Sequence, residues 1–465
     1  MSAFDPAHLI GLLEPFESAS RIWVAFSGGM DSSVLLAAAT EVRESLPGAL
    51  HAIHVDHGLH PDSALWAAHC AEFCRLRAIP LTTEHLQLAA RQGESLEALA
   101  REARYAVFAG LLGRGDLLLT AHHEDDQAET LLLALLRGSG ARGLAAMPVE
   151  ARLGRGYLVR PLLASHREEL LRYARARGLG WIEDPSNAHL TLDRNFLRHQ
   201  ILPRLRTRWP AVSTTLSRSA RHCAEAAQLV EGLALATLPQ LFGDHPGTLS
   251  IEMLEQLDRP LQKAVLRAWL EQHGFGLPDT SRLERVLDEV VAARADANPL
   301  VAWKGCEVRR YRGDLFCLVP LPAPPARTVD LPWRIGRMPS SLELPSGLGV
   351  LEWQPAVAEA MDGGRGRAVL ELHVRFAQVG HVCTPATEIH ARRLKDLFQT
   401  AGVPSWLRPY VPLVFCADGL IAIAGVCGCA HPRERGLGGA LLWKGQQQAQ
   451  IGAILRTPIH MRLPG

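Results

Sequence analysis

Two short polar segments of this chain each follow an apolar run that predicts a buried strand, and both carry residue types suited to chemistry. The first follows residues 22–26 and consists of Ser27, Gly28, Gly29, Met30, Asp31 and Ser32. Adjacent glycines let backbone N–H groups approach phosphate oxygens, and the helix predicted after them adds partial positive charge at its start. Asp31 would repel a phosphate unless a magnesium ion lay between them. The segment therefore suits a phosphate site, in which Asp31 would be a magnesium ligand, although the turn by itself favours a plain helix start.

A turn of this kind has a simpler interpretation. Glycines followed by Asp and Ser also begin ordinary helices, so the six residues by themselves leave a plain helix cap open. The hydroxyls of Ser27 and Ser32 are the additional donors that a phosphate site would use. The segment lacks the lysine of a Walker A loop, which argues against a kinase-like or GTPase-like site.

The second polar segment follows residues 117–121 and opens with the run HHEDD at 122–126. Carboxylates at a helix start are favoured by the helix dipole, so capping explains Glu124 or Asp125. It does not explain two histidines beside four carboxylates. Such a cluster suits magnesium coordination, recognition of a cationic amine, or removal of a proton from that amine. The candidate residues are His123, Asp126 and Glu129.

These segments need a scaffold that brings strand ends together, and the first part of the chain, to about residue 186, predicts one. Short apolar runs at 22–26, 50–55 and 117–121 alternate with Ala- and Leu-rich helical patterns. Such alternation predicts an α/β fold in which helices cover both faces of a parallel sheet. Ligands of such sheets bind beyond the carboxyl ends of the strands, where both polar segments fall.

The rest of the chain predicts two further modules. Residues from about 189 are mainly helical up to a Pro-rich stretch at 320–325, and short β-like runs with one helix at 390–400 then predict an α+β domain. Residues 194–224 hold seven arginines and no acidic residue, which suits an RNA-binding face or an ordinary solvated surface. We therefore expect domains at 1–188, 189–319 and 334–465.

The composition is that of an ordinary globular protein, with 48% hydrophobic and 21% charged residues among 465. Lys+Arg at 49 and Asp+Glu at 48 leave the net charge uninformative about partners. Nine cysteines form no disulfide-like framework, and the pairs Cys70/Cys74 and Cys427/Cys429 are not CxxC motifs. The N-terminus has no basic secretory region, and no apolar stretch is long enough to span a bilayer. We expect a reduced, cytoplasmic, soluble protein.

The string SGGMDS at 27–32, placed after an apolar strand, resembles the PP-loop of the adenine-nucleotide alpha-hydrolase superfamily. Residues 121–147, AHHEDDQAET followed by LLLALLRGSGARGLAAM, are similar to the second motif of the tRNA(Ile)-lysidine synthetases. Further matches occur in family order at 55–59, 101–105, 160–163, 181–187, 193–198, 394–399, 401–404 and 406–408. The resemblance thus covers nearly the whole chain.

This resemblance implies an enzyme that uses ATP and magnesium, with the PP-loop holding pyrophosphate. The family adenylates the wobble cytidine of the isoleucine tRNA with anticodon CAU, and free lysine then displaces AMP to form lysidine. Free lysine is mostly protonated, so a carboxylate or histidine must orient it and accept its proton. The expected catalytic residues are Asp31, His123, Asp126 and Glu129. We expect tRNA contacts at Arg194, Asn195 and Arg198.

Three rival functions stay open from the residues alone. A tRNA 2-thiolation enzyme of the same superfamily usually carries a CxxC pair, and Cys70 and Cys74 are spaced one residue too far apart. A non-catalytic RNA-binding protein would not need an intact PP-loop, and a small-molecule amide synthetase would not need the long C-terminal modules. Residues 376–381 hold fewer basic groups than the family pattern has, which leaves the RNA contacts of the last domain open. A homodimer is a further open arrangement.

Overall fold

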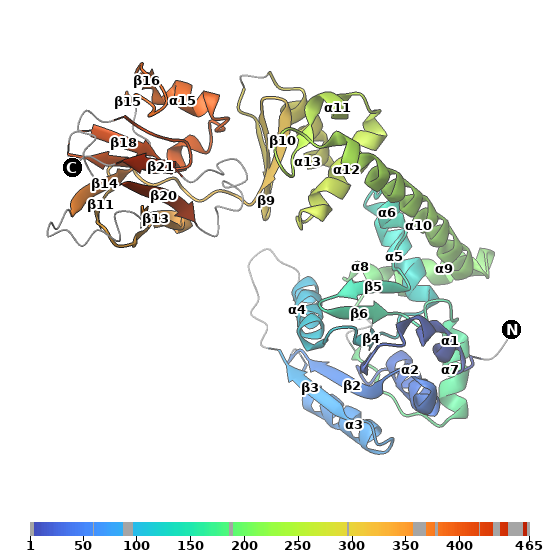
Figure 1. The fold of residues 1–465 in the computed structure, drawn as a ribbon. Coiled ribbons are helices and arrows are strands. Elements are labelled where there is room, and N and C mark those ends of the chain that lie inside the picture. Colours follow the sequence, from blue (N-terminus) through green and yellow to red (C-terminus); the bar gives the residue numbers. More distant parts are fainter. Residues whose placement is uncertain are drawn as a thin grey trace. The chain divides into compact units, whose positions relative to one another are not determined.

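The computed structural model describes residues 4–58, 60–86, 96–185, 189–294, 297–356, 369–376, 380–417, 419–430, 438–444 and 459–462 (Figure 1). The chain forms two compact units, residues 1–229 and 230–465. The three-domain division at 188, 319 and 334 is finer than this and stays a prediction. The Gly- and Arg-rich stretch at 363–367 and residues 377–379 lie outside the described residues.

The first unit is built on a six-stranded sheet in the order β3-β2-β1-β4-β6-β5, in which all neighbours are parallel except the β5–β6 hairpin. The strands are β1 (Arg21–Ala25), β2 (Ala49–Asp56), β3 (Leu81–His85), β4 (Leu117–Leu119), β5 (Glu150–Leu153) and β6 (Gly156–Val159). The sheet confirms the predicted α/β class. Because β1 pairs directly with β4, with Val24 opposite Leu119, the two polar segments leave the sheet side by side.

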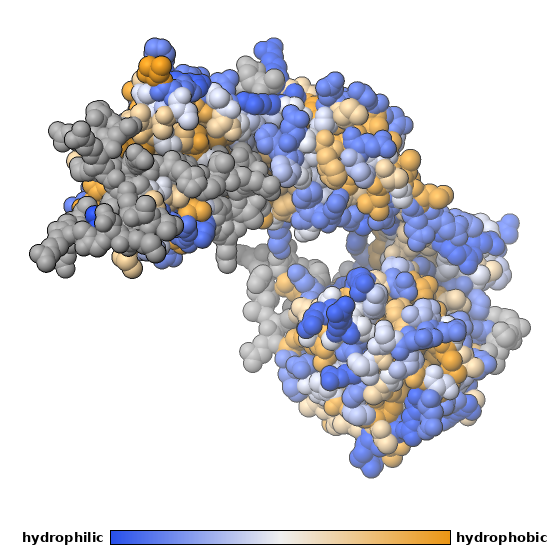
Figure 2. All heavy atoms as spheres, in the orientation of Figure 1, coloured by the Kyte–Doolittle hydropathy of each residue, from blue (hydrophilic) through white to orange (hydrophobic). Residues whose placement is uncertain are grey.

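Helices cover both faces of this sheet, which is why its central strands are apolar throughout rather than alternating. On one face, Val24 packs with α2 (Met30–Glu41), α3 (Ser63–Arg75) and α7 (Arg167–Ala176). On the other, Trp23 packs with Phe108 of α4 (Leu96–Leu111). Figure 1 shows α4 on the side of the sheet away from α2 and α7. Figure 2 shows hydrophilic and hydrophobic residues intermixed over the visible surface of this unit.

Three further helices belong to the first unit: α1 (His8–Leu13), α5 (Glu124–Leu136) and α6 (Ala141–Leu144). A helical arm then follows the sheet. It consists of α8 (Asp193–Phe196), a π-helical turn (Leu197–Ile201), α9 (Leu202–Arg208) and the long α10 (Val212–Thr237). The π-helical turn inserts extra backbone between α8 and α9, a feature that often marks functional sites.

The second unit begins with helices packed on a small antiparallel sheet. The helices are α11 (Ile251–Glu255), α12 (Arg259–Gln272), α13 (Thr280–Arg285) and a π-helical turn (Val286–Val291). The sheet has the order β7-β10-β9-β8, from β7 (Leu249–Ser250), β8 (Leu300–Trp303), β9 (Cys306–Tyr311) and β10 (Asp314–Leu318). The sequence indicated the helices and missed this sheet, whose strands contribute Val301, Val308 and Leu315 to the core around Trp269.

The described residues of the C-terminal part hold two larger antiparallel sheets and a two-stranded one, β15-β16 (Val382–Cys383 and Arg392–Arg393), and confirm the predicted α+β module. Of the two larger sheets, one has the order β11-β14-β17-β18-β19 and the other β12-β13-β20-β21. The strands are β11 (Asp330–Ile335), β12 (Ser340–Glu343), β13 (Val350–Pro355), β14 (Leu370–Arg375), β17 (Leu413–Cys416), β18 (Gly419–Ile423), β19 (Cys427–Gly428), β20 (Gly438–Lys444) and β21 (Ile459–Arg462). The helix predicted from residue 390 begins only at Leu394, as α15 (Leu394–Thr400), because β16 (Arg392–Arg393) pairs with β15 (Val382–Cys383).

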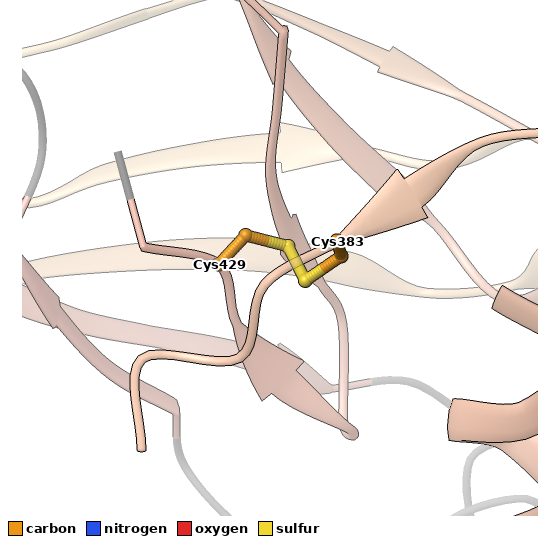
Figure 3. The surroundings of a disulfide bond; sticks show 2 residues. All are labelled: Cys383 and Cys429. Atoms are coloured by element: carbon orange, nitrogen blue, oxygen red, sulfur yellow. A yellow bond between two sulfur atoms is a disulfide. The ribbon is translucent and has the colours of Figure 1, made fainter. Parts of the chain in front are cut away.

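A disulfide joins Cys383, in β15, to Cys429, just beyond β19 (Figure 3). The sequence predicted reduced cysteines throughout, and that expectation is wrong for this pair. The two cysteines lie 46 residues apart, and only the packing of the sheet edge brings them together. Within the described residues, no helix combines the length and apolar character needed to cross a bilayer.

Candidate active site

The glycine-rich turn after β1 has a backbone that its sequence requires. Gly28 has φ +80°, a left-handed conformation that residues with a Cβ rarely adopt. A Cβ built at Gly28 would lie 3.0 Å from both the Cys70 sulfur and the Ile182 side chain. A side chain at this position would therefore be both strained and crowded. The turn leads directly into α2, whose first turn has no side-chain cap and leaves its N–H groups available for an anion.

Two serine hydroxyls stabilise this turn internally. The hydroxyls of Ser27 and Ser32 lie 3.0 Å apart, and Ser32 Oγ donates to the Gly29 carbonyl at 3.0 Å. The Gly29 N–H donates to Ser27 Oγ at 3.3 Å. Met30 is 6% exposed, so its side chain belongs to the core and only its backbone can face a ligand. The predicted phosphate-binding residues thus form one compact turn.

Asp31 is the acidic residue of the turn, and its two oxygens differ. Oδ1 is buried without a hydrogen-bond partner. Oδ2 lies 3.7 Å from Nε2 of His123, at the end of the neighbouring strand. A buried, unpaired carboxylate oxygen beside a phosphate-binding turn fits a magnesium ligand, because magnesium is usually held by one or two carboxylates together with substrate phosphates. Among the described residues, no group of three His, Cys, Asp or Glu side chains could hold a metal by itself.

His123 is the N-cap of α5 and connects the two polar segments. Its ring atom Nδ1 accepts from the backbone N–H of Asp125 at 3.2 Å. Its backbone N–H donates to Asp126 Oδ2 at 3.0 Å. Because Nδ1 is an acceptor here, the ring hydrogen of the neutral histidine is on Nε2, directed at the carboxylates of Asp31 and Asp126. The sequence left a simple role at the helix start open for Glu124 or Asp125. Both lie in the first turn of α5, where the helix dipole favours them, while the hydrogen-bonded cap consists of His123 and Asp126.

Two arginines of the helical arm bind the carboxylates of α5. Arg194 donates from Nε to Glu129 Oε2 at 2.7 Å and from Nη2 to Asp126 Oδ1 at 2.9 Å. Arg198 donates from Nε to Glu129 Oε1 at 2.6 Å and from Nη2 to Asp126 Oδ1 at 2.7 Å. Glu129 is fully buried and Asp126 is 7% exposed. The four side chains form what we call the arginine–carboxylate quartet, whose formal charges cancel.

The quartet and His123 control the protonation of Asp126. Burial by itself raises the pKa of this carboxyl, but the neighbouring His123 ring and the guanidinium groups of Arg194 and Arg198 together hold that pKa well below its usual range. For His123, burial lowers the pKa, while the carboxylates of Asp126 and Asp31 outweigh that effect and leave it raised. Asp126 is therefore an anion at neutral pH.

The other two carboxylates of the α5 start hold the arm in place. Glu124 accepts from His166 Nδ1 at 2.6 Å and from Thr214 Oγ1 at 3.3 Å. Asp125 accepts from Arg206, which also donates to Ser213 at 3.1 Å. Thr214 and Ser213 belong to α10. All four carboxylates thus contact the helical arm, and Asp126 also lies beside His123, which faces Asp31 of the PP-loop.

The structure places the remaining predicted residue, Asn195, in a structural position. Its side-chain amide donates to the His189 carbonyl at 3.0 Å, and the residue is 7% exposed. Sequence reasoning assigned no role to two buried polar residues beside the site, His54 and Arg160. His54 is one of two histidines in the otherwise apolar run at 50–55, and Arg160 opens the family match at 160–163. Arg160 is 6% exposed and donates to the Pro148 carbonyl at 2.6 Å.

Comparison with protein families accounts for most of the chain. A PP-loop domain family matches residues 6–205. The family described as the TilS substrate binding domain matches residues 249–316, and the TilS substrate C-terminal domain matches residues 372–450. The three matches follow the order predicted from the sequence motifs.

Relatives that match along most of their own length point to the same family as these domain matches. The tRNA(Ile)-lysidine synthase of Coxiella burnetii is 43% identical over 436 residues, covering 93% of this chain and 95% of its own. The tRNA(Ile)-lysidine synthase of Methylococcus capsulatus is 43% identical over 406 residues, which cover 86% of this chain and 90% of its own. Among solved structures, the U34-tRNA thiolase NcsA from Methanococcus maripaludis aligns with a TM-score of 0.41 at 17% identity, over 47% of this chain and 77% of its own. The chain therefore belongs to the tRNA(Ile)-lysidine synthase family, whose members are ATP-dependent ligases built on a PP-loop domain.

Proposed function

We propose that this chain uses ATP to join free lysine to the wobble cytidine of the isoleucine tRNA with anticodon CAU, through an adenylated-tRNA intermediate. The observation that carries the proposal is the position of His123, whose Nε2 lies 3.7 Å from Asp31 of the PP-loop and 3.5 Å from Asp126 of α5. Two chemical steps, activation and amine attack, need two groups of residues that share one pocket. The names of relatives spanning nearly the whole chain support the same activity.

In the first step the PP-loop would hold the pyrophosphate that leaves ATP. Backbone N–H groups from Gly28 to Met30 and the hydroxyls of Ser27 and Ser32 are the donors. Asp31, with its unpaired oxygen, would hold magnesium, which spreads the negative charge that develops on the leaving group. This arrangement binds the leaving group through interactions that strengthen as the bond to it breaks.

In the second step Asp126 and Glu129 would receive the ammonium group of lysine. Both carboxylates are already bound to Arg194 and Arg198, so the ammonium group must replace at least one guanidinium. A tRNA phosphate would give a displaced guanidinium a new anionic partner. Asp126 and Glu129 could then bind lysine while Arg194 and Arg198 contact tRNA, as both were expected to do. A carboxylate would then accept the amine proton, because the free nitrogen of neutral His123 is occupied by the Asp125 N–H.

Residues 189–319 and 334–465 would form the surfaces that bind tRNA, in agreement with the family descriptions that their matched parts carry. Arg194, Asn195 and Arg198 would lie where this surface meets the catalytic unit. We place the enzyme in the cytoplasm, where its tRNA substrate, ATP and free lysine occur together. A homodimer stays a proposal that a mass measurement in solution tests.

The deciding experiment supplies labelled lysine, ATP and magnesium together with an isoleucine tRNA transcript carrying the CAU anticodon. Label should enter this RNA and remain absent from a transcript whose wobble cytidine is replaced by uridine. A parallel reaction with a sulfur donor tests the 2-thiolation alternative. Sulfur incorporation without lysine incorporation would overturn the proposed activity.

A further inference from the structure

His54 is a buried histidine of β2 that belongs to neither polar segment. It is 6% exposed and lies on a strand whose neighbouring residues Ala52 and Ile53 are apolar and buried. Its Nδ1 lies 2.9 Å from the carbonyl oxygen of Phe26, the residue immediately before the PP-loop. A carbonyl oxygen can only accept, so the hydrogen is on Nδ1 and His54 is the donor.

The hydrogen bond from His54 to the Phe26 carbonyl lies where the backbone ladder between β1 and β2 ends. The parallel ladder between β1 and β2 ends at the pair Ala25 and Ile53, and the Phe26 N–H makes the last rung, to the Ile53 carbonyl at 2.8 Å. Beyond this rung the chain turns away from β2 into the loop. The Phe26 carbonyl therefore receives its hydrogen from a side chain, at the point where the sheet stops supporting the backbone.

Two further carbonyls of the same turn are held in the same manner. The Gly28 carbonyl accepts from the Ile182 N–H at 2.9 Å. The Gly29 carbonyl accepts from Ser32 Oγ at 3.0 Å and from the Ser33 N–H at 3.0 Å. The carbonyls of Phe26, Gly28 and Gly29 thus all accept from protein donors. Amide groups whose carbonyls are tied down in this way keep their N–H groups oriented for an anion without reorganisation when it arrives.

We propose that His54 is a positioning residue for the ATP site: its Nδ1–H orients the Phe26 carbonyl and so presets the PP-loop for pyrophosphate. This inference rests on the proposed role of the loop in the first step of the reaction. Cys70 packs against both partners of this arrangement. Its sulfur lies 3.5 Å from Nδ1 of His54 and limits the space at Gly28. Burial raises the pKa of the Cys70 thiol to about 12, so the sulfur stays neutral and acts only through packing.

The alternative is that His54 merely fills the core, and substitutions of matched shape separate the two roles. Asn places its Nδ2 donor close to the position of the histidine Nδ1, because both atoms are bonded to Cγ. Gln carries its donor one bond farther out, and Leu carries none. His51 lies on the same strand, with its ring tilted against Trp23 at a centroid distance of 4.8 Å. Within the described residues it has no hydrogen bond or ring contact with residues 27–32, so His51→Leu is the control.

The experiment measures steady-state ATP consumption with saturating tRNA and lysine, together with thermal unfolding, for each variant. We expect His54→Leu to raise the KM for ATP about tenfold, the effect of one lost hydrogen bond, and to leave the KM for lysine within about twofold. His54→Asn should stay close to wild type, while His54→Gln should resemble His54→Leu. His51→Leu should lower the unfolding temperature without changing the KM for ATP.

Several outcomes would overturn the inference. A folded His54→Leu protein with the wild-type KM for ATP would show that the contact is dispensable. Equal changes in the KM values for ATP and lysine would show that His54 only supports the core. If His54→Leu does not fold, an Asn variant no better than the Gln variant decides against the proposal. Failure of the proposed function is distinguishable, because wild-type protein would then consume no ATP in this assay.

Discussion

The Nε atom of Arg198 lies 2.6 Å from Oε1 of Glu129, a carboxylate that is fully buried. Arg194 binds the other oxygen at 2.7 Å, so each oxygen of Glu129 accepts from a guanidinium nitrogen. Because a buried carboxylate needs a cationic partner, removing one guanidinium is favourable only if another cation takes its place. Under the proposed function, lysine would therefore compete with the arginines for the quartet, and tRNA would be the partner that favours the exchange.

Glu129→Gln tests the assignment of this carboxylate to lysine. Glutamine keeps the shape and removes the charge, so ATP consumption and the adenylated-tRNA intermediate should persist while lysine transfer falls by at least about a hundredfold. Single-turnover kinetics with labelled ATP and labelled lysine separate the two steps. Glu124→Gln is the matched control, because Glu124 is a buried carboxylate of the same helix that pairs with His166. A Glu129→Gln protein that forms no intermediate would place Glu129 with magnesium instead.

The Arg194→Ala/Arg198→Ala double variant tests the contact with RNA. If both guanidiniums move to tRNA phosphates, the slope of log binding constant against log salt should become shallower by about 1.4 to 1.8, because fewer counterions are released. Filter binding over a range of salt concentrations measures the slope. Arg204→Ala/Arg208→Ala, which removes two exposed arginines of α9, is the control for general charge. If the salt dependence of the double variant equals that of wild type, Arg194 and Arg198 bind only the carboxylates of Asp126 and Glu129 and do not contact tRNA phosphates.

Asp31→Ala tests the metal and phosphate site. Loss of the carboxylate should abolish AMP and pyrophosphate production while tRNA affinity stays within about twofold, because Asp31 belongs to the PP-loop and not to the arginines expected to contact RNA. Pyrophosphate release measures the first effect and filter binding the second. Asp62→Ala, at the exposed start of α3, should leave both unchanged. Normal AMP production by Asp31→Ala would remove this residue from the ATP site.

Asp126→Asn tests the charge balance of the quartet through pH. The folded-state pKa of Asp126 is lowered, so its carboxylate stabilises the fold fully above the unfolded-state pKa of about 3.9. That contribution is lost as the pH falls through the lower folded-state pKa. The difference in unfolding free energy between wild type and Asp126→Asn should therefore be constant from neutral pH to about pH 5 and shrink below pH 4.

Denaturant unfolding at a series of pH values measures this difference. Glu72→Gln is the control, because Glu72 forms an exposed ion pair with Arg75 and should contribute little at any pH. A difference between wild type and Asp126→Asn that does not vary with pH would mean that the carboxylate is stabilised by hydrogen bonds to the neutral and charged forms alike.

Local sequence determined the central strands of the first sheet and the glycine turn that follows β1. The turn after β1 could be predicted because only glycine tolerates the positive φ at Gly28 and the nearby side chains of Cys70 and Ile182. The apolar run at 22–26 indicated a strand covered on both faces, and the structure buries Ile22, Trp23 and Val24. These features depend on neighbours within a few residues, which is the range over which steric limits and capping act.

Only the tertiary structure decided which charges meet. Arg194 and Glu129 are 65 residues apart, and Arg198 and Asp126 are 72 apart, while the chain offers 48 acidic residues as partners. A run of arginines without acidic neighbours predicts a positive surface, but its partners are set by the packing of α8 on α5. The same limit applies to the Cys383–Cys429 disulfide and to the Phe26 carbonyl that His54 holds. Charge, thiol and hydrogen-bond pairing act through space, and the distance through space between two residues is fixed by the fold as a whole.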